Sequence, residues 1–253
     1  MRKLTIFLIT LFVGLQIFAQ QNSLLQKANE FYKQKEYSQA AELYEQALQK
    51  GVAPEIYYNL GNAYFKMGEN GKAILNYERA LRLAPNYSDA KANLRFVQTK
   101  IADEQQDVGA FFIIRWADRF IDLFPSNTWL FISVAAFVAT LVCLMFFFFG
   151  NSLTTRKRAF YFTFILLIIS ILCFIFSGIQ KNNLRSNSQA VIMNGAVTAK
   201  SSPDKSGTDL FVIHEGSTVS ITSELGNWVE IKFGGSNVGW VENSMLERVN
   251  PVK

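Results

Sequence analysis

Long apolar stretches alternate along the chain with segments in which apolar and polar residues are mixed. Three of the apolar stretches carry no charged residue, at residues 4–19, 129–149 and 159–179. The second and third have 21 residues each, and a helix of that length extends ~31 Å, the thickness of a bilayer core. Burial as core helices is the alternative, but no other segment is large enough to cover them. We therefore predict two transmembrane helices, over residues 129–149 and 159–179.

The first apolar stretch lies in a segment, residues 1–19, that has the form of a secretory signal peptide. Arg2 and Lys3 precede the apolar residues, and Ala19 stands before a polar segment, as it does at a cleavage site. An uncleaved membrane anchor is the alternative. In either case, we expect the chain from residue 20 onward to be exported.

The net charge of +5 is not spread evenly over the chain. Residues 20–107 carry 11 basic and 11 acidic residues, and residues 180–253 carry seven of each. The excess consists of two short clusters beside apolar stretches: Arg2 and Lys3, and Arg156, Lys157 and Arg158. Charge in that position is a membrane-topology signal, so we expect no nucleic-acid binding.

The segment between the two predicted spans indicates how they face. Residues 150–158 carry Arg156, Lys157 and Arg158 and no acidic residue. The positive-inside rule places such a short loop in the cytoplasm. The spans then form a hairpin with both flanking segments on the outer face, in agreement with an exported N-terminus. In a Gram-negative cell, the protein would lie in the inner membrane with both soluble domains in the periplasm.

A further helix is predicted immediately before the first span. Residues 108–128 combine apolar and charged positions at near-helical spacing. We expect an amphipathic helix in the outer interface, with Trp116 and Trp129 at headgroup level. Pro125 would end this helix before the transmembrane helix begins. A linker helix packed on the soluble domain is the open alternative.

Small and aromatic residues recur at an offset of 33 in the exported N-terminal segment. The pairs are Ala28 and Gly61, Phe31 and Tyr64, Ala40 and Ala73, Tyr44 and Tyr77, and Ala47 and Ala80. Small residues suit close helix crossings, and aromatic residues fill the neighbouring groove. The pattern resembles the tetratricopeptide repeat, with units at residues 23–54 and 55–87 and a capping helix at 88–107, in a domain of residues 20–107. Because such repeats need neighbours to bury their faces, this short array calls for help from the membrane or a partner.

The resemblance implies a concave, partner-binding surface formed by the first helix of each unit. The residues carried over to it are Leu25, Gln26, Asn29, Tyr32 and Lys33 from the first unit and Tyr58, Asn59, Asn62, Phe65 and Lys66 from the second. Asparagine amides both donate and accept hydrogen bonds, so Asn29, Asn59 and Asn62 suit the backbone of an extended peptide. The family's carboxylate-binding version needs basic residues where this chain has Leu25, Asp89 and Asn93, so recognition of a free C-terminus is not expected. Surface asparagines with no partner are the alternative.

Residues 186–253 alternate β-branched and polar residues between glycine-bearing turns, which predicts short strands. We place these strands at residues 190–192, 219–221, 228–231 and 238–241, with a hairpin loop at 234–237. The order resembles a bacterial SH3-like domain, since a glycine stands shortly before both Trp228 and Trp240 on either side of the hairpin. The two tryptophans are the candidate binding face, although we expect at least one to pack in the core. Bacterial SH3-like domains often bind peptidoglycan peptides.

The sequence offers little that could support catalysis. His214 is the only histidine, and a structural role in its turn motif is expected. Cys143 and Cys173 lie inside the predicted spans, at depths ~10 Å apart, too far for a disulfide. The chain has no glycine-rich nucleotide-binding motif. We expect no catalytic residue, no metal site and no cofactor.

The order of segments predicts a multi-domain membrane protein: an all-α tetratricopeptide helical repeat, a two-helix transmembrane hairpin and a small all-β SH3-like barrel. This order resembles the BatE family of the Bacteroides aerotolerance operon. The resemblance implies a non-enzymatic membrane protein whose companions are a MoxR-type ATPase and membrane proteins with von Willebrand factor A domains. The favoured hypothesis is an envelope scaffold that binds proteins, and the alternative is a cell-wall sensor or tether that binds peptidoglycan.

Overall fold

The computed structural model divides into two compact units. The first consists of Met1–Val108 and Ser186–Lys253, and the second of Gly109–Arg185. Within them the structure describes residues 23–101, 103, 116, 120–150, 152–185, 188–234 and 237–250. The expected signal peptide at residues 1–19 and most of the juxtamembrane segment lie outside the described residues.

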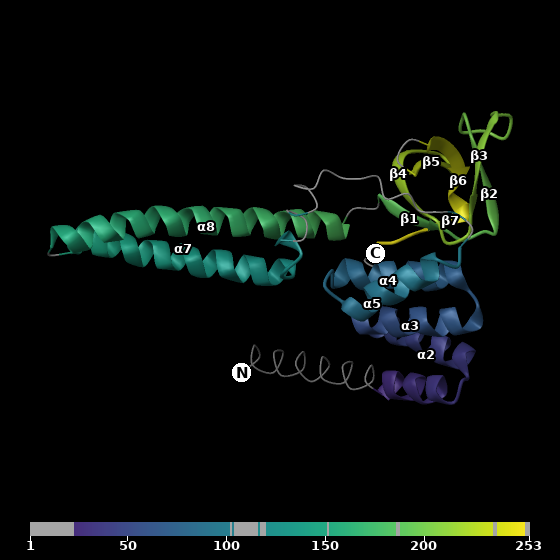
Figure 1. Ribbon diagram of the computed structural model, residues 1–253, viewed down its shortest axis with the longest axis horizontal. Helices are drawn as coiled ribbons and strands as arrows, with labels where there is room; N and C mark the ends of the chain where they lie inside the picture. The colour runs from purple at the N-terminus through teal and green to yellow at the C-terminus, as the bar shows by residue number, and fades with distance from the viewer. Residues whose placement is uncertain are drawn as a thin grey trace, which may run out of the picture. The chain divides into compact units, whose positions relative to one another are not determined.

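Helical hairpins make up the N-terminal part of the first unit (Figure 1). A helix over residues 23–33 is followed by α2 (Tyr37–Lys50), α3 (Pro54–Met67), α4 (Asn70–Leu83) and α5 (Ser88–Gln98). Proline begins α3, and Gly68 ends it at a φ of 83°, which glycine adopts without strain. This order confirms the expected helical repeat. The last helix is shorter than the expected cap of residues 88–107, and the Thr99 hydroxyl closes its final turn on the Phe96 carbonyl at 2.7 Å.

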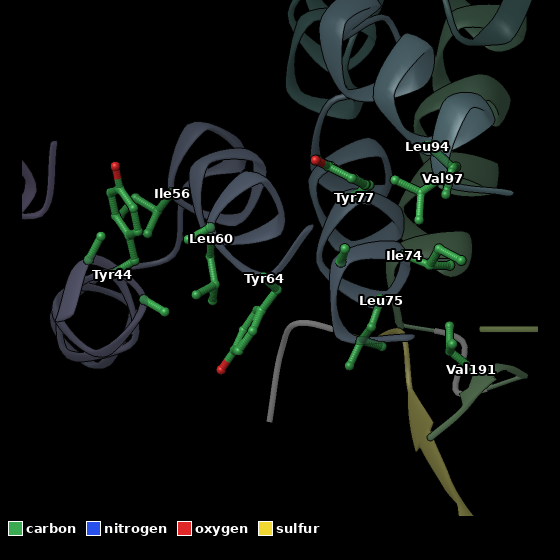
Figure 2. Packing of buried hydrophobic residues seen from close by; sticks show 14 of the residues in the cluster. Tyr44, Ile56, Leu60, Tyr64, Ile74, Leu75, Tyr77, Leu94, Val97 and Val191 are labelled. Atoms are coloured by element: carbon green, nitrogen blue, oxygen red, sulfur yellow. The ribbon is translucent and has the colours of Figure 1, made fainter. Parts of the chain in front are cut away.

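The small residues of the repeat lie at buried positions between the helices. Those that recur at the offset of 33 are all buried: Ala28, Ala40, Ala47, Gly61, Ala73 and Ala80. A Cβ atom on Gly61 would lie 2.8 Å from the Tyr77 ring, so a larger residue at this crossing would have to displace the buried ring. Figure 2 shows Tyr44 and Tyr77 in the same cluster, where they are the largest fully buried side chains. The core therefore repeats with the sequence.

Seven strands form the antiparallel sheet of the C-terminal part, in the order β3-β2-β6-β5-β4-β1-β7. They are β1 (Gln189–Ile192), β2 (Ala196–Lys200), β3 (Asp209–His214), β4 (Thr218–Leu225), β5 (Trp228–Phe233), β6 (Asn237–Glu242) and β7 (Leu246–Arg248). Ile192, Ile213 and Ile231 are fully buried in its core. The sheet is consistent with the expected SH3-like domain, and the sequence pattern alone does not place β2, β3 and β7.

Trp228 and Trp240 share one face of this sheet. Trp228 pairs with Glu242 and Trp240 pairs with Glu230 across β5 and β6, so alternation puts all four side chains on the same side. Both tryptophans are half-buried, and neither belongs to the core cluster of the sheet. The expectation that at least one packs in the core is wrong, because the alternate residue Val229 faces inward in their place.

The barrel packs against the helical repeats and extends their core. Val191 of β1 belongs to the same buried cluster as Ile74 of α4 (Figure 2). Gly216, at a φ of 88°, lies against this surface, since a Cβ atom there would be 2.8 Å from Ile101 and 3.0 Å from Ile74. Such repeats need a neighbour to bury the faces that they leave exposed, and here the face is that of α4. The barrel of the same chain is that neighbour.

Polar contacts surround this apolar interface. The carboxylate of Glu215 accepts a hydrogen bond at 3.0 Å from the backbone N–H of Gly71, in the first turn of α4, where a helix favours negative charge. The guanidinium of Arg79 donates to the Glu247 carboxylate at 2.7 Å and to the Arg248 carbonyl at 3.0 Å. The two soluble modules are therefore joined by both packing and charge.

The second unit contains two helices, α7 (Ser126–Phe149) and α8 (Leu153–Arg185), that are long and apolar enough to cross a membrane. Pro125 stands immediately before α7, which begins three residues earlier than the expected span of residues 129–149. The segment expected as a loop at residues 150–158 is mostly helical, and its three basic residues lie in the first turns of α8: Arg156, Lys157 and Arg158. The physical reason is the Ser152 hydroxyl, which accepts the Thr155 N–H at 3.0 Å and caps the helix.

Serines join α7 to α8 along a polar seam. Ser133 Oγ donates to the Ser170 carbonyl at 2.8 Å, and Ser170 Oγ donates back to the Ser133 carbonyl at 3.0 Å. One heptad away, Ser126 Oγ donates to the Ser177 carbonyl at 3.1 Å. This register places the two free cysteines about thirteen residues apart in depth, or ~20 Å, and no disulfide is formed.

Candidate functional site

A shallow groove crosses the helical repeats. Its cavity has a volume of about 180 Å³ and is lined by Asn29, Tyr32, Lys33, Tyr44, Asn59 and Asn62. Pockets for small molecules have volumes of roughly 300–1,000 Å³, so this cavity fits a single side chain or a stretch of peptide backbone better. The structure thus brings five of the expected groove residues together and adds Tyr44.

Two asparagines of the groove make the same contact in successive repeats. Asn29 Oδ1 accepts a hydrogen bond at 2.6 Å from the Tyr44 hydroxyl, and Asn62 Oδ1 accepts one at 2.7 Å from the Tyr77 hydroxyl. Both members of the second pair follow those of the first at the offset of 33. Burial raises the pKa of Tyr44 to about 12 and raises that of Tyr77 as well, so both hydroxyls keep their protons at neutral pH and donate them.

These contacts change what Asn29 and Asn62 offer to a ligand. Sequence reasoning expects each amide both to donate and to accept, and each carbonyl oxygen already accepts a hydrogen bond from a tyrosine of the chain, Tyr44 or Tyr77. The Nδ2 groups remain as donors held in fixed orientations. Asn59 is half-buried in the same lining and is not held by a tyrosine hydroxyl of this kind. It is therefore the groove asparagine best suited to donate and accept together.

The charge of the groove is one-sided. Among the residues that the structure describes, its lining contains the exposed Lys33 and no carboxylate. Within the described part of the chain, no ion pair neutralises the Lys33 ammonium group. Together with the amide donors, this arrangement favours a ligand rich in hydrogen-bond acceptors, such as peptide carbonyls or acidic side chains.

The groove surface continues onto α5, where sequence reasoning considered Asn93 only as a position for a carboxylate-binding cation and did not expect Phe96. Asn93 Nδ2 donates to Asn62 Oδ1 at 2.8 Å. Phe96 is 53% exposed, and its ring packs edge-on against Phe65 at a centroid distance of 5.7 Å. The sequence does contain a signal for this extension. Asn93 and Phe96 stand 34 residues after Asn59 and Asn62, so they hold the corresponding positions of the next helix.

The remaining expected groove residues lie outside the cavity lining. Tyr58 packs between two other tyrosines, with ring centroids 6.1 Å from Tyr77 and 5.0 Å from Tyr87. Lys66 is exposed in the last turn of α3. Tyr58 therefore supports the wall of the groove, whereas Lys66 adds a second positive charge further along α3.

The barrel carries the second candidate surface. Trp228 and Trp240 lie on one face of β5 and β6, each opposite a glutamate on the neighbouring strand. Val238, on the same face, is 43% exposed. An aromatic surface with carboxylates beside it suits ligands that carry apolar groups and ammonium ions.

The only histidine has a carboxylate and a serine nearby, but their arrangement differs from that of a hydrolase triad. His214 Nδ1 lies 2.7 Å from Asp103 Oδ1, and the Ser217 hydroxyl donates to Asp103 Oδ2 at 2.8 Å. In a triad, the serine hydroxyl would contact the imidazole rather than the carboxylate. Ser217 is also fully buried. These three residues join the barrel to the segment after α5. Among the described residues, no cluster of histidine, cysteine and carboxylate side chains could hold a metal ion.

Comparison with protein families supports both modules. Residues 28–68 match a family model described as TPR repeat, and residues 54–87 match one described as tetratricopeptide repeat. Residues 195–247 match a model described as bacterial SH3 domain. Compared with curated proteins, the chain has no significant match. The two matched families are typically binding modules, and no enzyme family is among the matches. The chain combines tetratricopeptide repeats, two helices that could span a membrane and a bacterial SH3 domain.

Proposed function

We propose that the protein is a non-enzymatic membrane scaffold that holds an extended segment of a partner protein in its helical groove. The observation that carries this proposal is the paired asparagine and tyrosine contact at Asn29 and Asn62. It fixes two amide donors on one surface, beside Lys33 and Asn59. Donors at repeating positions suit the repeating carbonyl groups of an extended peptide backbone.

The position of the barrel supports this use of the groove. Its contacts are made with α4 and with the segment around Ile101 and Asp103. The groove is lined instead by the helix over residues 23–33, by α2 and by α3. The barrel can therefore brace the repeats while the groove stays open to a partner.

The membrane topology of the proposal follows from charge. Arg156, Lys157 and Arg158 lie at the turn between the two helices that could span a membrane, which favours a cytoplasmic position for this turn. Both soluble modules would then lie on the outer face of the inner membrane, in the periplasm of a Gram-negative cell. An export signal at residues 1–19 is part of the same proposal.

The resemblance to the BatE family suggests which complex the scaffold serves. Under this proposal, the partners are von Willebrand factor A membrane proteins, and the complex includes a MoxR-type ATPase and acts in aerotolerance or envelope stress. An exported groove would reach a cytoplasmic ATPase only through such membrane partners or through the basic turn of the hairpin.

The groove is tested by co-purification of partners with the tagged full-length protein from native membranes in mild detergent. The variant Asn59→Ala with Lys33→Ala removes two lining groups without touching the asparagines that hold Tyr44 and Tyr77. The matched control is Gln49→Ala with Lys50→Ala, an amide and a lysine exposed at the end of α2. We expect quantitative mass spectrometry to show a specific partner lost from the groove variant only. Equal recovery with both variants would refute binding in the groove.

A second candidate function is binding of peptidoglycan peptides by the barrel. The face that contains Trp228 and Trp240 favours it, because exposed aromatic rings attract the free ammonium groups that cell-wall peptides carry. The full-length protein in detergent should sediment with purified peptidoglycan, and Trp240→Ala should reduce the sedimented fraction. The control is Val52→Ala, since Val52 is 48% exposed between α2 and α3 and lies outside the sheet. Protein that stays in the supernatant would count against this function.

A further inference from the structure

The turn end of the α7–α8 hairpin contains a cavity that the scaffold function leaves unused. It has a volume of about 580 Å³ and is lined by Phe147, Phe148, Leu153, Arg156, Lys157, Phe160 and Tyr161. This volume falls within the ~300–1,000 Å³ range of ligand sites. Its wall is mostly aromatic, with two cations, so it differs from the purely apolar surface of the helices on either side.

The cations at this cavity have no negative charge near them. Arg156 Nη2 donates to the Phe148 carbonyl at 3.0 Å, which holds the guanidinium group at the end of α7 while its other N–H groups remain as donors. No ion pair involves Arg156, Lys157 or Arg158 within the described residues, and the segment of residues 150–158 contains no acid. The positive charge of this end of the hairpin is therefore uncompensated.

The aromatic wall is exposed on the same end. Phe148 is 64% exposed, Tyr161 is 67% exposed and Leu153 is 77% exposed. In a membrane-spanning hairpin, a turn with three cations lies at headgroup level, and the apolar residues next to it meet the upper acyl chains. The cavity thus has a cationic rim and an apolar wall, which matches the two halves of a phospholipid.

We propose that this cavity binds the headgroup of an anionic phospholipid, with its phosphate on Lys157 and Arg156 and its upper acyl chain against Phe160 and Tyr161. Charge complementarity decides in favour of a net-negative lipid, since a zwitterionic headgroup would place its own ammonium group beside the three cations. The site anchors the turn of the hairpin to one lipid class, independently of what the helical groove binds.

Native mass spectrometry of the full-length protein in detergent tests the site. The probes are phosphatidylglycerol and phosphatidylcholine with identical acyl chains, and glycerol phosphate as a water-soluble source of the same phosphate chemistry. We expect phosphatidylglycerol to bind more tightly than phosphatidylcholine. Lys157→Gln should weaken phosphatidylglycerol binding about fivefold, the effect of one cation near an anionic surface. The control Lys181→Gln removes an exposed lysine far along the same helix and should leave binding unchanged.

A second variant separates the cavity from general surface charge. Phe160→Ala keeps every cation but removes part of the aromatic wall, and it should also weaken phosphatidylglycerol binding severalfold. Equal binding of the two lipids, equal effects of Lys157→Gln and Lys181→Gln, or no effect of Phe160→Ala would each overturn the proposal. Binding of glycerol phosphate as tight as that of the lipid would overturn the lipid as the occupant. Unchanged helical circular dichroism shows that each variant remains folded.

Discussion

Asp103 is the residue through which the docking of the barrel on the helical repeats can be tested most sharply. Its carboxylate accepts the backbone N–H of His214 at 2.7 Å and the hydroxyl of the buried Ser217 at 2.8 Å, and it lies 2.7 Å from His214 Nδ1. Hydrogen bonds to charged groups contribute about 1.5–3 kcal/mol each, and bonds that share one carboxylate are not additive. We expect Asp103→Ala to lower the free energy of opening this interface by about 3 kcal/mol.

Amide hydrogen exchange of the full-length protein measures this change. A loss of about 3 kcal/mol raises the exchange rate at the His214 amide about 100-fold, if the amide exchanges through opening of the interface. The control is Asp204→Ala, whose carboxylate contacts Ser206 within its own hairpin loop at 2.7 Å and 2.6 Å. It should leave exchange at His214 unchanged. Unaltered exchange at His214 in Asp103→Ala would refute the inference that this carboxylate joins the two modules.

Three further predictions follow from contacts of the same kinds. Burial raises the pKa of Asp103, but its hydrogen bonds from His214 and Ser217 outweigh this effect and hold the pKa below the usual value. The contribution of Asp103 to stability is therefore present above about pH 4 and lost as pH falls through the lowered pKa. Urea titrations at pH 7 and pH 3 would show this loss. Replacing Ser133 with alanine should reduce the stability of the hairpin by ~0.6 kcal/mol, the average contribution of one interhelical hydrogen bond in membranes. Only the bond donated by the Ser133 hydroxyl is lost, since alanine keeps the backbone carbonyl that accepts from Ser170. A reversible unfolding assay in bicelles checks this value, and no change would contradict the seam. Gly216→Ala should lower the melting temperature more than Gly226→Ala. Both glycines have a positive φ, but only a Cβ atom at position 216 would meet Ile101. Equal shifts in thermal scans would contradict the close contact.

The helical repeat and the two apolar helices could be predicted because their signals are local. The offset of 33 is visible in the sequence, and the residues that recur, such as Ala40 and Ala73, are the ones that the fold buries. An uncharged run long enough to cross a bilayer needs no tertiary information. The same holds for the groove, of which Asn59 and Lys33 could be placed by position within the repeat.

The contacts between modules could not be predicted, because they join residues that are distant in sequence. His214 and Asp103 are 111 positions apart, and nothing in either local pattern shows that the turn of the barrel meets the segment after α5. The fixed orientation of Asn62 depends on the Tyr77 hydroxyl, which sequence reasoning treats only as a bulky filler. The outward position of Trp240 depends on strand register, which alternation alone leaves open by one residue.

Site-specific photo-crosslinking shows whether the helical groove holds a partner protein in native membranes. A photoreactive phenylalanine derivative replaces Asn59 in the full-length protein, and in a parallel sample it replaces the exposed Gln49 of α2. After illumination of native membranes, mass spectrometry identifies what is attached at each position. We expect a discrete protein adduct at position 59, mapped to one extended segment of that protein, and no such adduct at position 49. The same adducts at both positions, or none at position 59, would contradict a partner-binding groove.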